Sequence, residues 1–427
     1  MRYRKFYLFQ KIFMMSKDDV VIPLFAPSFQ RLRADAVWVT IANWAEGFED
    51  EYGKAEVFAG NSSYTSSQVR ARCFPSNSGK KRDKKVSAFR KSYLAKLLET
   101  FLKDLRWFYE EKKSLDIDIN QFKKTPFIWQ HHDLFQTRGL KLAKKLKIPS
   151  VLFVDAPYVW ESTKWGMNRF GWEWFAKRWG DAKPCKNADL VLVVSEEVKQ
   201  AVLDLGVEEN KVLITPCTVS SKRFDKSQAY ELRNSLGLLD NFVIGWVGSF
   251  RKFHSLDLLL DAFEKISSSI PHAKLLLVGD GPERLRLIKK AVNLGLSDRI
   301  FFTGNIPHNE VNAHIGSFDV AVLPSQSNEG FHYSPLKLRE FFAAGVPVVA
   351  SAVGDVKIVI EESDGGWLVA PGSKDSIAKM LQEIESNRGE LNSAALKARN
   401  YAVAEMGIAK QIQMIKDYFG FTSKPSN

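Results

Sequence analysis

The chain alternates short apolar runs with longer amphipathic stretches, and this pattern occurs in two successive series. In the first half, the apolar runs span residues 19–25, 55–60, 126–132, 149–157 and 188–195. Short apolar runs between turn-forming residues indicate buried strands. Between these runs, residues 33–51 and 87–113 carry apolar side chains at helical spacing, which predicts helices.

The second half repeats this rhythm. Its apolar runs span residues 241–248, 273–281, 299–305, 318–325 and 346–351, and helical patterns at 256–267, 282–294 and 335–344 separate them. Strands that alternate with helices predict parallel, doubly wound sheets with helices on both faces. We therefore expect an α/β protein with two Rossmann-like domains that face each other across a cleft. The polar segment 214–227 marks the boundary, so the expected domains are 1–218 and 219–405, and a helix in 406–427 packs back on the first domain.

One predicted helix start carries an unusual set of residues. Ser334 suits the N-cap, Pro335 the first helical position and Gly345 the position that ends the helix. An open helix N-terminus attracts anions, and Lys337 in its first turn adds a positive charge. Glu340 lies on the same face, where a carboxylate can accept hydrogen bonds from ribose hydroxyls. This set suits a nucleotide diphosphate; the alternative is a surface ion pair between Lys337 and Glu340, worth about 0–1 kcal/mol.

The segment "SPLKLREFFAAGVPVVAS" resembles the nucleotide-sugar signature of the GT-B glycosyltransferases of family 4. Residues 131–157 and 187–224 resemble the end of that family's first domain. Four further stretches resemble its second domain in the family's order: 245–263, 274–287, 302–325 and 365–378. The resemblance covers most of the chain. It implies a retaining transfer of a sugar from a UDP-, GDP- or ADP-sugar donor, without a metal ion or other cofactor.

The resemblance assigns roles around the helix start. By the family's spacing, Glu340 holds the ribose, and the catalytic residue facing the donor sugar lies eight positions earlier. That position holds His332 where the family has a Glu, and Glu329 lies three residues further upstream. Either His332 or Glu329 therefore takes this place. The first turn of the helix is expected to bind the donor through Ser334, Pro335 and Leu336.

A second group of donor-binding residues is expected after the first strand of the second domain. The family supplies an Arg and a Lys there, but the matching positions hold Ser249 and His254. Arg251 and Lys252 lie between them and could deliver the same charge to the leaving diphosphate, which gains negative charge in the transition state. The alternative for this pair is a solvated turn. The other expected donor contacts are Gly248, Gly279 in a turn that is otherwise only a tight strand-to-helix connection, and Ile306 near the base.

In the first domain, the family places a His or an Asp after the strand that precedes the interdomain segment. That position holds Asp155, which could stabilise positive charge on the reacting sugar or accept the acceptor's proton. The alternative is that Asp155 caps the following loop. His131 and His132 end the preceding strand, and alternation predicts that one of them, taken as His132, faces the cleft. The family's glycine-rich turn after the first strand is missing, and Arg31 and Arg33 could meet an anionic acceptor there.

Composition restricts the class of protein and its location. The 427 residues are 45% hydrophobic, which is typical of a globular protein, and no apolar run is long enough to span a membrane. Three widely spaced cysteines, Cys73, Cys185 and Cys217, favour a reducing cytoplasm. Residues 1–220 carry 37 Lys and Arg against 26 Asp and Glu, a net +11, and the remaining residues carry 24 against 23. The first domain is therefore expected to meet an anionic partner.

Residues 160–186 combine five of the eleven tryptophans with six basic residues, Lys164, Arg169, Lys177, Arg178, Lys183 and Lys186. Trp and basic side chains together suit an anionic membrane surface. We therefore expect peripheral docking on the cytoplasmic face of a membrane and a glycan or lipid-linked acceptor. The alternative is that these tryptophans are core residues. No nucleic-acid recognition motif accompanies them, so no nucleic-acid partner is expected.

The function predicted from the sequence is a hexosyltransferase-type glycosyltransferase in the synthesis of a surface polysaccharide or glycolipid. One alternative is a nucleotide-sugar epimerase on the same architecture, and the ordered family signatures count against it. The other is a non-catalytic nucleotide-sugar-binding protein. Ser249, His254 and His332, which replace charged residues of the family pattern, favour this second alternative.

Overall fold

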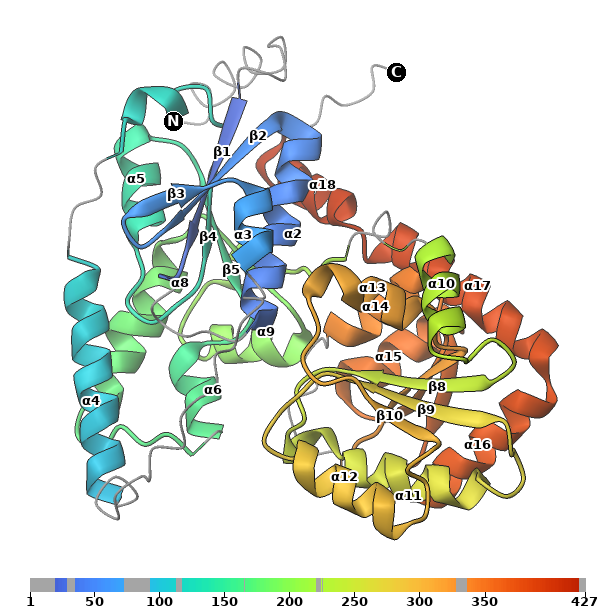
Figure 1. Cartoon of the computed structure of the whole chain (residues 1–427). Coiled ribbons are helices and arrows are strands. Elements are labelled where there is room, and N and C mark those ends of the chain that lie inside the picture. The colour runs from blue at the N-terminus through green and yellow to red at the C-terminus, as the bar shows by residue number, and fades with distance from the viewer. Residues whose placement is uncertain are drawn as a thin grey trace, which may run out of the picture. The chain divides into compact units, whose positions relative to one another are not determined.

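The computed structural model describes residues 20–28, 35–72, 93–112, 117–164, 166–219, 224, 226–327 and 336–421. The chain forms two compact units, Met1–Pro216 with Gln411–Asn427, and Cys217–Lys410. In each unit, the described strands form one sheet with helices against its two faces (Figure 1); the second sheet is parallel throughout, and the first is parallel except at one edge. The predicted class, two Rossmann-like doubly wound domains, is confirmed.

The first unit is built on a seven-stranded sheet of the described residues, in the order β3-β2-β1-β4-β5-β6-β7. Its strands are β1 (Val20–Ala26), β2 (Gly53–Ala59), β3 (Ser62–Tyr64), β4 (Ile128–His131), β5 (Ser150–Val154), β6 (Leu190–Val193) and β7 (Val212–Ile214). All neighbours pair in parallel except β2 and β3, which form an antiparallel hairpin at the edge. The strand order reverses between β1 and β4. Such a reversal opens a crevice at the carboxyl ends of the strands.

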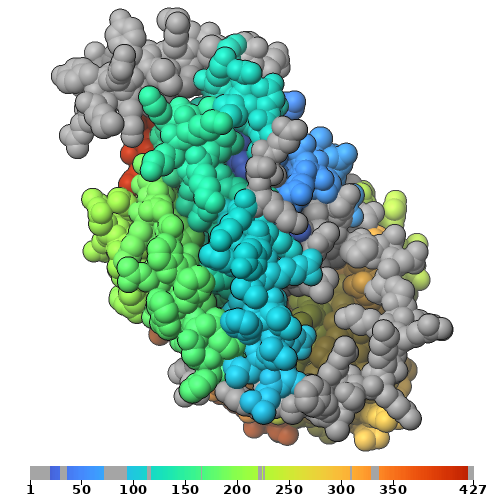
Figure 2. All heavy atoms as spheres, turned by 90° about the vertical axis from the view of Figure 1, so that its left-hand side faces the viewer, coloured from blue at the N-terminus to red at the C-terminus, as the bar shows by residue number. Residues whose placement is uncertain are grey.

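The helices of the first unit flank this sheet. They are α2 (Asp35–Tyr52), α3 (Ser66–Arg72), α4 (Tyr93–Glu110), α5 (Arg138–Leu146), α6 (Tyr158–Lys164), α7 (Glu173–Phe175), a π-helix (Ala176–Ala182), α8 (Lys183–Asn187), α9 (Glu196–Leu203) and most of α18 (Ile408–Phe419). Helix α4 runs along the surface of this unit, where Figure 2 shows it in cyan. No described helix is long and apolar enough to cross a membrane.

Packed aromatic rings lie in the core of the first unit. Trp44 of α2 lies 5.7 Å from Trp129 of β4 and 5.8 Å from Phe153 of β5, measured between ring centroids. The α18 segment is tied to the same unit. Gln411 donates to the Pro216 carbonyl at 2.6 Å, and Tyr418 donates to the Asp189 carbonyl at 3.1 Å. The end of the chain thus packs beside residues that precede it by about half the sequence.

The second unit is built on a six-stranded parallel sheet of the described residues, in the order β10-β9-β8-β11-β12-β13. Its strands are β8 (Phe242–Val247), β9 (Ala273–Val278), β10 (Ile300–Phe302), β11 (Val320–Leu323), β12 (Val348–Ser351) and β13 (Gly366–Val369). Its helices are α10 (Lys226–Ser235), α11 (Leu256–Ile266), α12 (Arg284–Asn293), α13 (His308–Gly316), α14 (Leu336–Ala344), α15 (Gly354–Ser363), α16 (Lys374–Ser386) and α17 (Arg388–Glu405).

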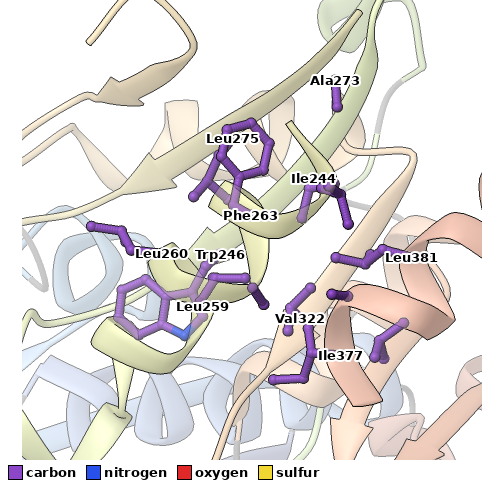
Figure 3. Close-up of a cluster of buried hydrophobic side chains, with 14 of the residues drawn as sticks. Ile244, Trp246, Leu259, Leu260, Phe263, Ala273, Leu275, Val322, Ile377 and Leu381 are labelled. Carbon is purple, nitrogen blue, oxygen red and sulfur yellow. The ribbon is translucent and has the colours of Figure 1, made fainter. Parts of the chain in front are cut away.

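Strand side chains of the second unit alternate between two buried apolar clusters, one on each face of the sheet. On β8, Ile244 and Trp246 join the cluster under α11 and α16, and Val243 and Val247 join the cluster on the opposite face. Figure 3 shows Trp246 beside Leu259 of α11. Each such buried side chain contributes about 1.5–3 kcal/mol. Burial on both faces explains why these strands are continuous apolar runs in the sequence.

Candidate functional site

The second sheet itself indicates where a ligand binds. Its strand order reverses between β8 and β11. In open α/β sheets, ligands bind outside the carboxyl ends of the strands at such a reversal. Residues 248–254 follow β8, and α14 follows β11. The residues expected to bind the donor therefore gather at the edge where the topology places a ligand.

Two glycine turns shape this edge. Gly248 and Gly279 have φ of 142° and 124°, which L side chains rarely adopt. A Cβ on Gly279 would lie 2.0 Å from the Gly248 carbonyl oxygen, and one on Gly281 would lie 2.5 Å from the Phe250 carbonyl oxygen. The turns after β8 and β9 therefore pack backbone against backbone. This contact favours the tight-turn interpretation of residues 279–281.

Lys337, in the first turn of α14, has an unusual environment. Its Nζ lies 3.3 Å from His254 Nδ1 and 4.5 Å above the Trp246 ring, and a Cβ on Gly248 would lie 3.3 Å from it. No ion pair of the described residues joins Lys337 to a carboxylate within 4.0 Å, and the choice between a donor site and a surface pair with Glu340 stays a prediction. Burial lowers the pKa of Lys337 to about 7, although the charge of Glu340 opposes this. A half-buried amine without a carboxylate partner among the described residues is a candidate anion-binding group.

Sequence reasoning missed the aromatic floor under this amine. Trp246 is buried, and its ring centroid lies 5.3 Å from that of His254, which in turn lies 4.3 Å from Phe253. Cations bind favourably to such rings. The sequence did carry a signal for this ring. Trp246 lies two positions before Gly248, and residues two positions apart along a strand lie on the same face.

The other residues expected at the donor lie as follows. Arg251 and Lys252 are exposed in the turn after β8, and Leu336 and Glu340 are half-buried on α14. Ile306 packs against the apolar cluster on one face of the sheet. Glu329, His332, Ser334 and Pro335 lie outside the described residues, as do Arg31 and Arg33.

If this edge binds a nucleotide diphosphate, as the sequence predicts, the binding should depend on pH through Lys337. In the free protein this amine loses its proton near pH 7, because burial lowers its pKa, whereas a bound diphosphate would keep it charged. Binding then takes up about one proton, so the Kd of UDP should rise above about pH 7, by at most about tenfold per pH unit. Isothermal titration calorimetry in buffers of different ionisation enthalpy measures both the Kd and the proton uptake.

A variant pair isolates this effect. Lys337→Met should weaken UDP binding about 10- to 150-fold, because a hydrogen bond to a charged group contributes about 1.5–3 kcal/mol, and should abolish the pH dependence. Lys289→Met, which removes an exposed lysine of α12 in the same unit, is the matched control. A wild-type Kd that stays constant above about pH 7 would contradict the role of Lys337.

In the first unit, Asp155 and His131 meet at the ends of neighbouring strands. Asp155 follows β5, and its Oδ2 lies 3.4 Å from Nε2 of His131, the last residue of β4. The other oxygen accepts a hydrogen bond from the Ala156 amide at 3.0 Å, as the loop-capping alternative predicts. The Asp155 side chain is 26% exposed, whereas His131 is fully buried. Asp155 thus presents a carboxylate to solvent with an imidazole behind it.

His132 is paired with a buried carboxylate of the same unit. Its ring is buried, and Nε2 lies 3.0 Å from Oδ1 of Asp181 in the π-helix. Asp181 also accepts hydrogen bonds from the amides of Tyr158 and Val159 at the start of α6. Both imidazoles are buried, and the expectation that His132 faces the cleft stays a prediction. Asp181, which no sequence motif marks, connects β4 to α6.

Some of residues 160–186 are buried, as the core interpretation predicts, and others are exposed. Arg169, expected among the membrane-facing cations, is 1% exposed, and its Nε donates to Asp104 Oδ2 at 2.7 Å. Trp172 donates to the same oxygen at 3.0 Å. In contrast, Trp174 and Trp179 are exposed, and Lys177, Arg178 and Lys183 are exposed beside them. Trp165 lies outside the described residues.

Two observations concern metal and thiol chemistry. No group of three or more His, Cys, Asp or Glu among the described residues is arranged to hold a metal ion. Cys185 and Cys217 are both buried and are not in disulfides. Burial also raises the pKa of the Cys185 thiol. A buried thiol of this kind is unreactive, so these two residues are structural.

Two doubly wound α/β units, each with a strand-order reversal in its sheet, are the architecture of the GT-B glycosyltransferases. The family described as Glycosyltransferase Family 4 matches residues 38–223, and the family described as Glycosyl transferases group 1 matches residues 229–402. The chain belongs to the family 4 type of GT-B glycosyltransferases.

Individual relatives match less of the chain. The N-acetyl-alpha-D-glucosaminyl L-malate synthase of Bacillus anthracis is 30% identical over 213 residues, 48% of this chain and 54% of that protein. The D-inositol 3-phosphate glycosyltransferase of Geodermatophilus obscurus is 28% identical over 227 residues, 51% and 50%. This chain thus spans about half the length of the curated relatives it matches. The crystal structure of Anabaena HepE in complex with UDP superimposes with a TM-score of 0.61 at 15% identity, covering 94% of this chain and 100% of that one.

Proposed function

We propose that this protein transfers a sugar from a nucleotide-diphosphate sugar to a glycan or lipid-linked acceptor, with retention of configuration and without a metal ion or other cofactor. The observation that carries the proposal is Lys337, a half-buried amine in the first turn of α14, beside Gly248 and over the Trp246 ring. A diphosphate bound there would be an anionic partner for this amine. The UDP complex of the structurally similar HepE agrees with such a donor.

The two units are proposed to have different roles. In the second unit, Lys337 and the amides of the first turn of α14 bind the diphosphate, Glu340 holds the ribose, and Arg251 and Lys252 stabilise the leaving group. Glu329 or His332 faces the donor sugar. In the first unit, Asp155 acts at the reacting carbon or on the acceptor hydroxyl. We further propose a cytoplasmic location and a role in surface polysaccharide or glycolipid synthesis, from the cysteine pattern and the basic, Trp-rich residues 160–186.

Thermal-shift measurements with UDP-, GDP- and ADP-sugars test the donor site. One nucleotide class should raise the apparent stability by about 2.7 kcal/mol at a hundredfold excess over Kd, because a ligand stabilises the state to which it binds. In Glu340→Gln the shift should shrink, since the carboxylate that accepts from the ribose is lost. Glu383→Gln, at an exposed position of α16, should respond as wild type does. A flat response to all three classes would overturn the proposal.

Catalysis is tested separately from binding. Without an acceptor, a retaining glycosyltransferase should release the free nucleotide slowly by donor hydrolysis, and the rate should fall in Glu340→Gln. Intact nucleotide binding with neither hydrolysis nor transfer would show that the protein only binds nucleotide sugars.

A further inference from the structure

Helix α4 presents a second apolar face that no described residue covers. Its buried side includes Thr100, Asp104 and Trp107. Its opposite side carries six exposed apolar residues, the α4 stripe: Leu94, Leu98, Phe101, Leu102, Leu105 and Tyr109. Leu94 is 72% exposed, and Leu98 and Leu102 are each 54% exposed. At about 100° per residue, the six fall within one sector about 100° wide. One side of α4 thus packs on the first unit, and among the described residues nothing covers the apolar stripe on the other side.

Three exposed aromatic residues lie next to this stripe and form an aromatic rim: Phe170, Trp174 and Trp179. Phe170 is 80% and Trp174 66% exposed. The rim is attached to α4 through ring contacts. Phe101 lies 5.1 Å from Trp172, and Phe108 lies 5.6 Å from Phe175, which has Trp174 and Trp179 at 6.0 and 6.4 Å. Figure 2 shows α4 in cyan and the green segment beside it on one face of the molecule.

Positive charge surrounds these rings. Lys183 Nζ lies 4.4 Å from the Trp179 ring, and Lys112 Nζ lies 4.5 Å from the Phe108 ring. Residues 93–112 are themselves balanced, with four basic and four acidic residues. The excess comes from residues 160–186, where Lys164, Lys177, Arg178, Lys183 and Lys186 are exposed against one exposed acidic residue, Glu173. The surface therefore combines exposed apolar side chains with a positive surround.

We propose that the α4 stripe and the aromatic rim dock on the surface of an anionic lipid bilayer. A helix with an apolar sector and nearby cations lies in the plane of the headgroups, with its apolar side chains in the acyl boundary. Trp and Tyr prefer that boundary, and each nearby Lys or Arg adds about 1 kcal/mol of attraction to anionic lipid. A protein partner fits less well, because lysine is depleted in protein interfaces. This surface gives the proposed lipid-linked acceptor a physical route to the first unit, but binding to the bilayer does not depend on sugar transfer.

Vesicle sedimentation tests the proposal on the full chain. The wild-type protein should sediment with phosphatidylcholine vesicles that contain phosphatidylglycerol, and at least tenfold less with phosphatidylcholine alone or at high salt. The double variant Leu98→Glu/Leu102→Glu should bind the anionic vesicles about a hundredfold more weakly, because two leucines no longer enter the acyl boundary. Leu285→Glu and Leu396→Glu are the controls: these leucines are 71% and 63% exposed, lie in the second unit, and should leave binding unchanged.

A second measurement locates the contact. Lipids with brominated acyl chains quench tryptophans that reach the acyl boundary, and this quenching should be smaller in Trp174→Phe/Trp179→Phe than in wild type. Equal vesicle binding by all variants, or no binding by wild type, would overturn the proposal. A wild-type dimer in light scattering that becomes a monomer in Leu98→Glu/Leu102→Glu, without vesicle binding, would instead assign the surface to a second copy of the chain. UDP binding in the same double variant shows whether the fold and the donor site are intact.

Discussion

Replacing Asp155 by Asn should lower kcat by about 10²–10⁴-fold with little change in UDP affinity. The substitution keeps the size of the side chain and an oxygen that can accept from the Ala156 amide, at 3.0 Å in the native protein. It removes the negative charge that would stabilise the reacting sugar or take up the acceptor's proton. The residues proposed to bind UDP belong to the other unit and are unchanged. Steady-state transfer rates and UDP calorimetry on the same samples measure the two effects.

Asp204→Asn is the matched control for this experiment, because it removes an exposed carboxylate at the end of α9 in the same unit. Its kcat should equal that of wild type. Donor hydrolysis without acceptor, in which water replaces the acceptor hydroxyl, should fall together with transfer, because water also needs the charge stabilisation and the proton acceptor. Unchanged transfer by Asp155→Asn would leave this residue as a loop cap.

Most of the fold could be predicted from the sequence because its strands are buried on both faces. A strand such as β8 is then a continuous apolar run, and its bounds follow from the flanking turn residues. The short edge strands are different. β3 carries only Ser62–Tyr64, and β7 has three residues, so neither makes an apolar run that stands out. The π-helix at Ala176–Ala182 was also missed, because its backbone register has no compositional signal.

The parts of the site that belong to a sequence motif could be predicted, and the parts that depend on tertiary packing could not. The motif predicted that Lys337 lies in the first turn of a helix, but it did not predict which residues surround the amine. The contact of its Nζ with His254 Nδ1 joins residues 83 positions apart. In the same way, His131 and His132 are adjacent in sequence, but one meets Asp155 and the other Asp181. Strand alternation predicts that the two side chains point to opposite faces of the sheet, but it does not predict which residue each ring contacts.

The tryptophan-rich segment shows the same limit at a surface. Its sequence suits both a core and a membrane-facing surface, and the structure assigns different residues to each. Trp172 and Arg169 bond to Asp104 of α4, whereas Trp174 and Phe170 are exposed. Composition does not distinguish the buried residues of this segment from the exposed ones. Burial of Arg169 and Trp172 depends on their bonds to Asp104 of α4, a residue more than 60 positions earlier in the sequence.

Arg169→Met should destabilise the first unit by about 3–5 kcal/mol, with a fall in Tm of the order of 10 °C. Arg169 is fully buried. Its guanidinium donates to Asp104 at 2.7 Å and to Ser162 Oγ at 2.6 Å, and it lies 5.4 Å from the Tyr158 ring. Without it, the Asp104 carboxylate stays buried with only the Trp172 indole as donor, and a buried charge without its partner is costly. Thermal unfolding followed by circular dichroism measures the change.

The controls separate burial from charge pairing. Lys164 and Glu197 form a pair at 2.6 Å with side chains 34% and 46% exposed, so Lys164→Met should cost at most about 1 kcal/mol. The double variant Arg169→Met/Asp104→Leu should be more stable than Arg169→Met alone, because no charge is then left buried. If Arg169→Met unfolds at the wild-type temperature, the pair does not hold α4 against residues 166–172. The aromatic rim would then need another anchor beside the α4 stripe.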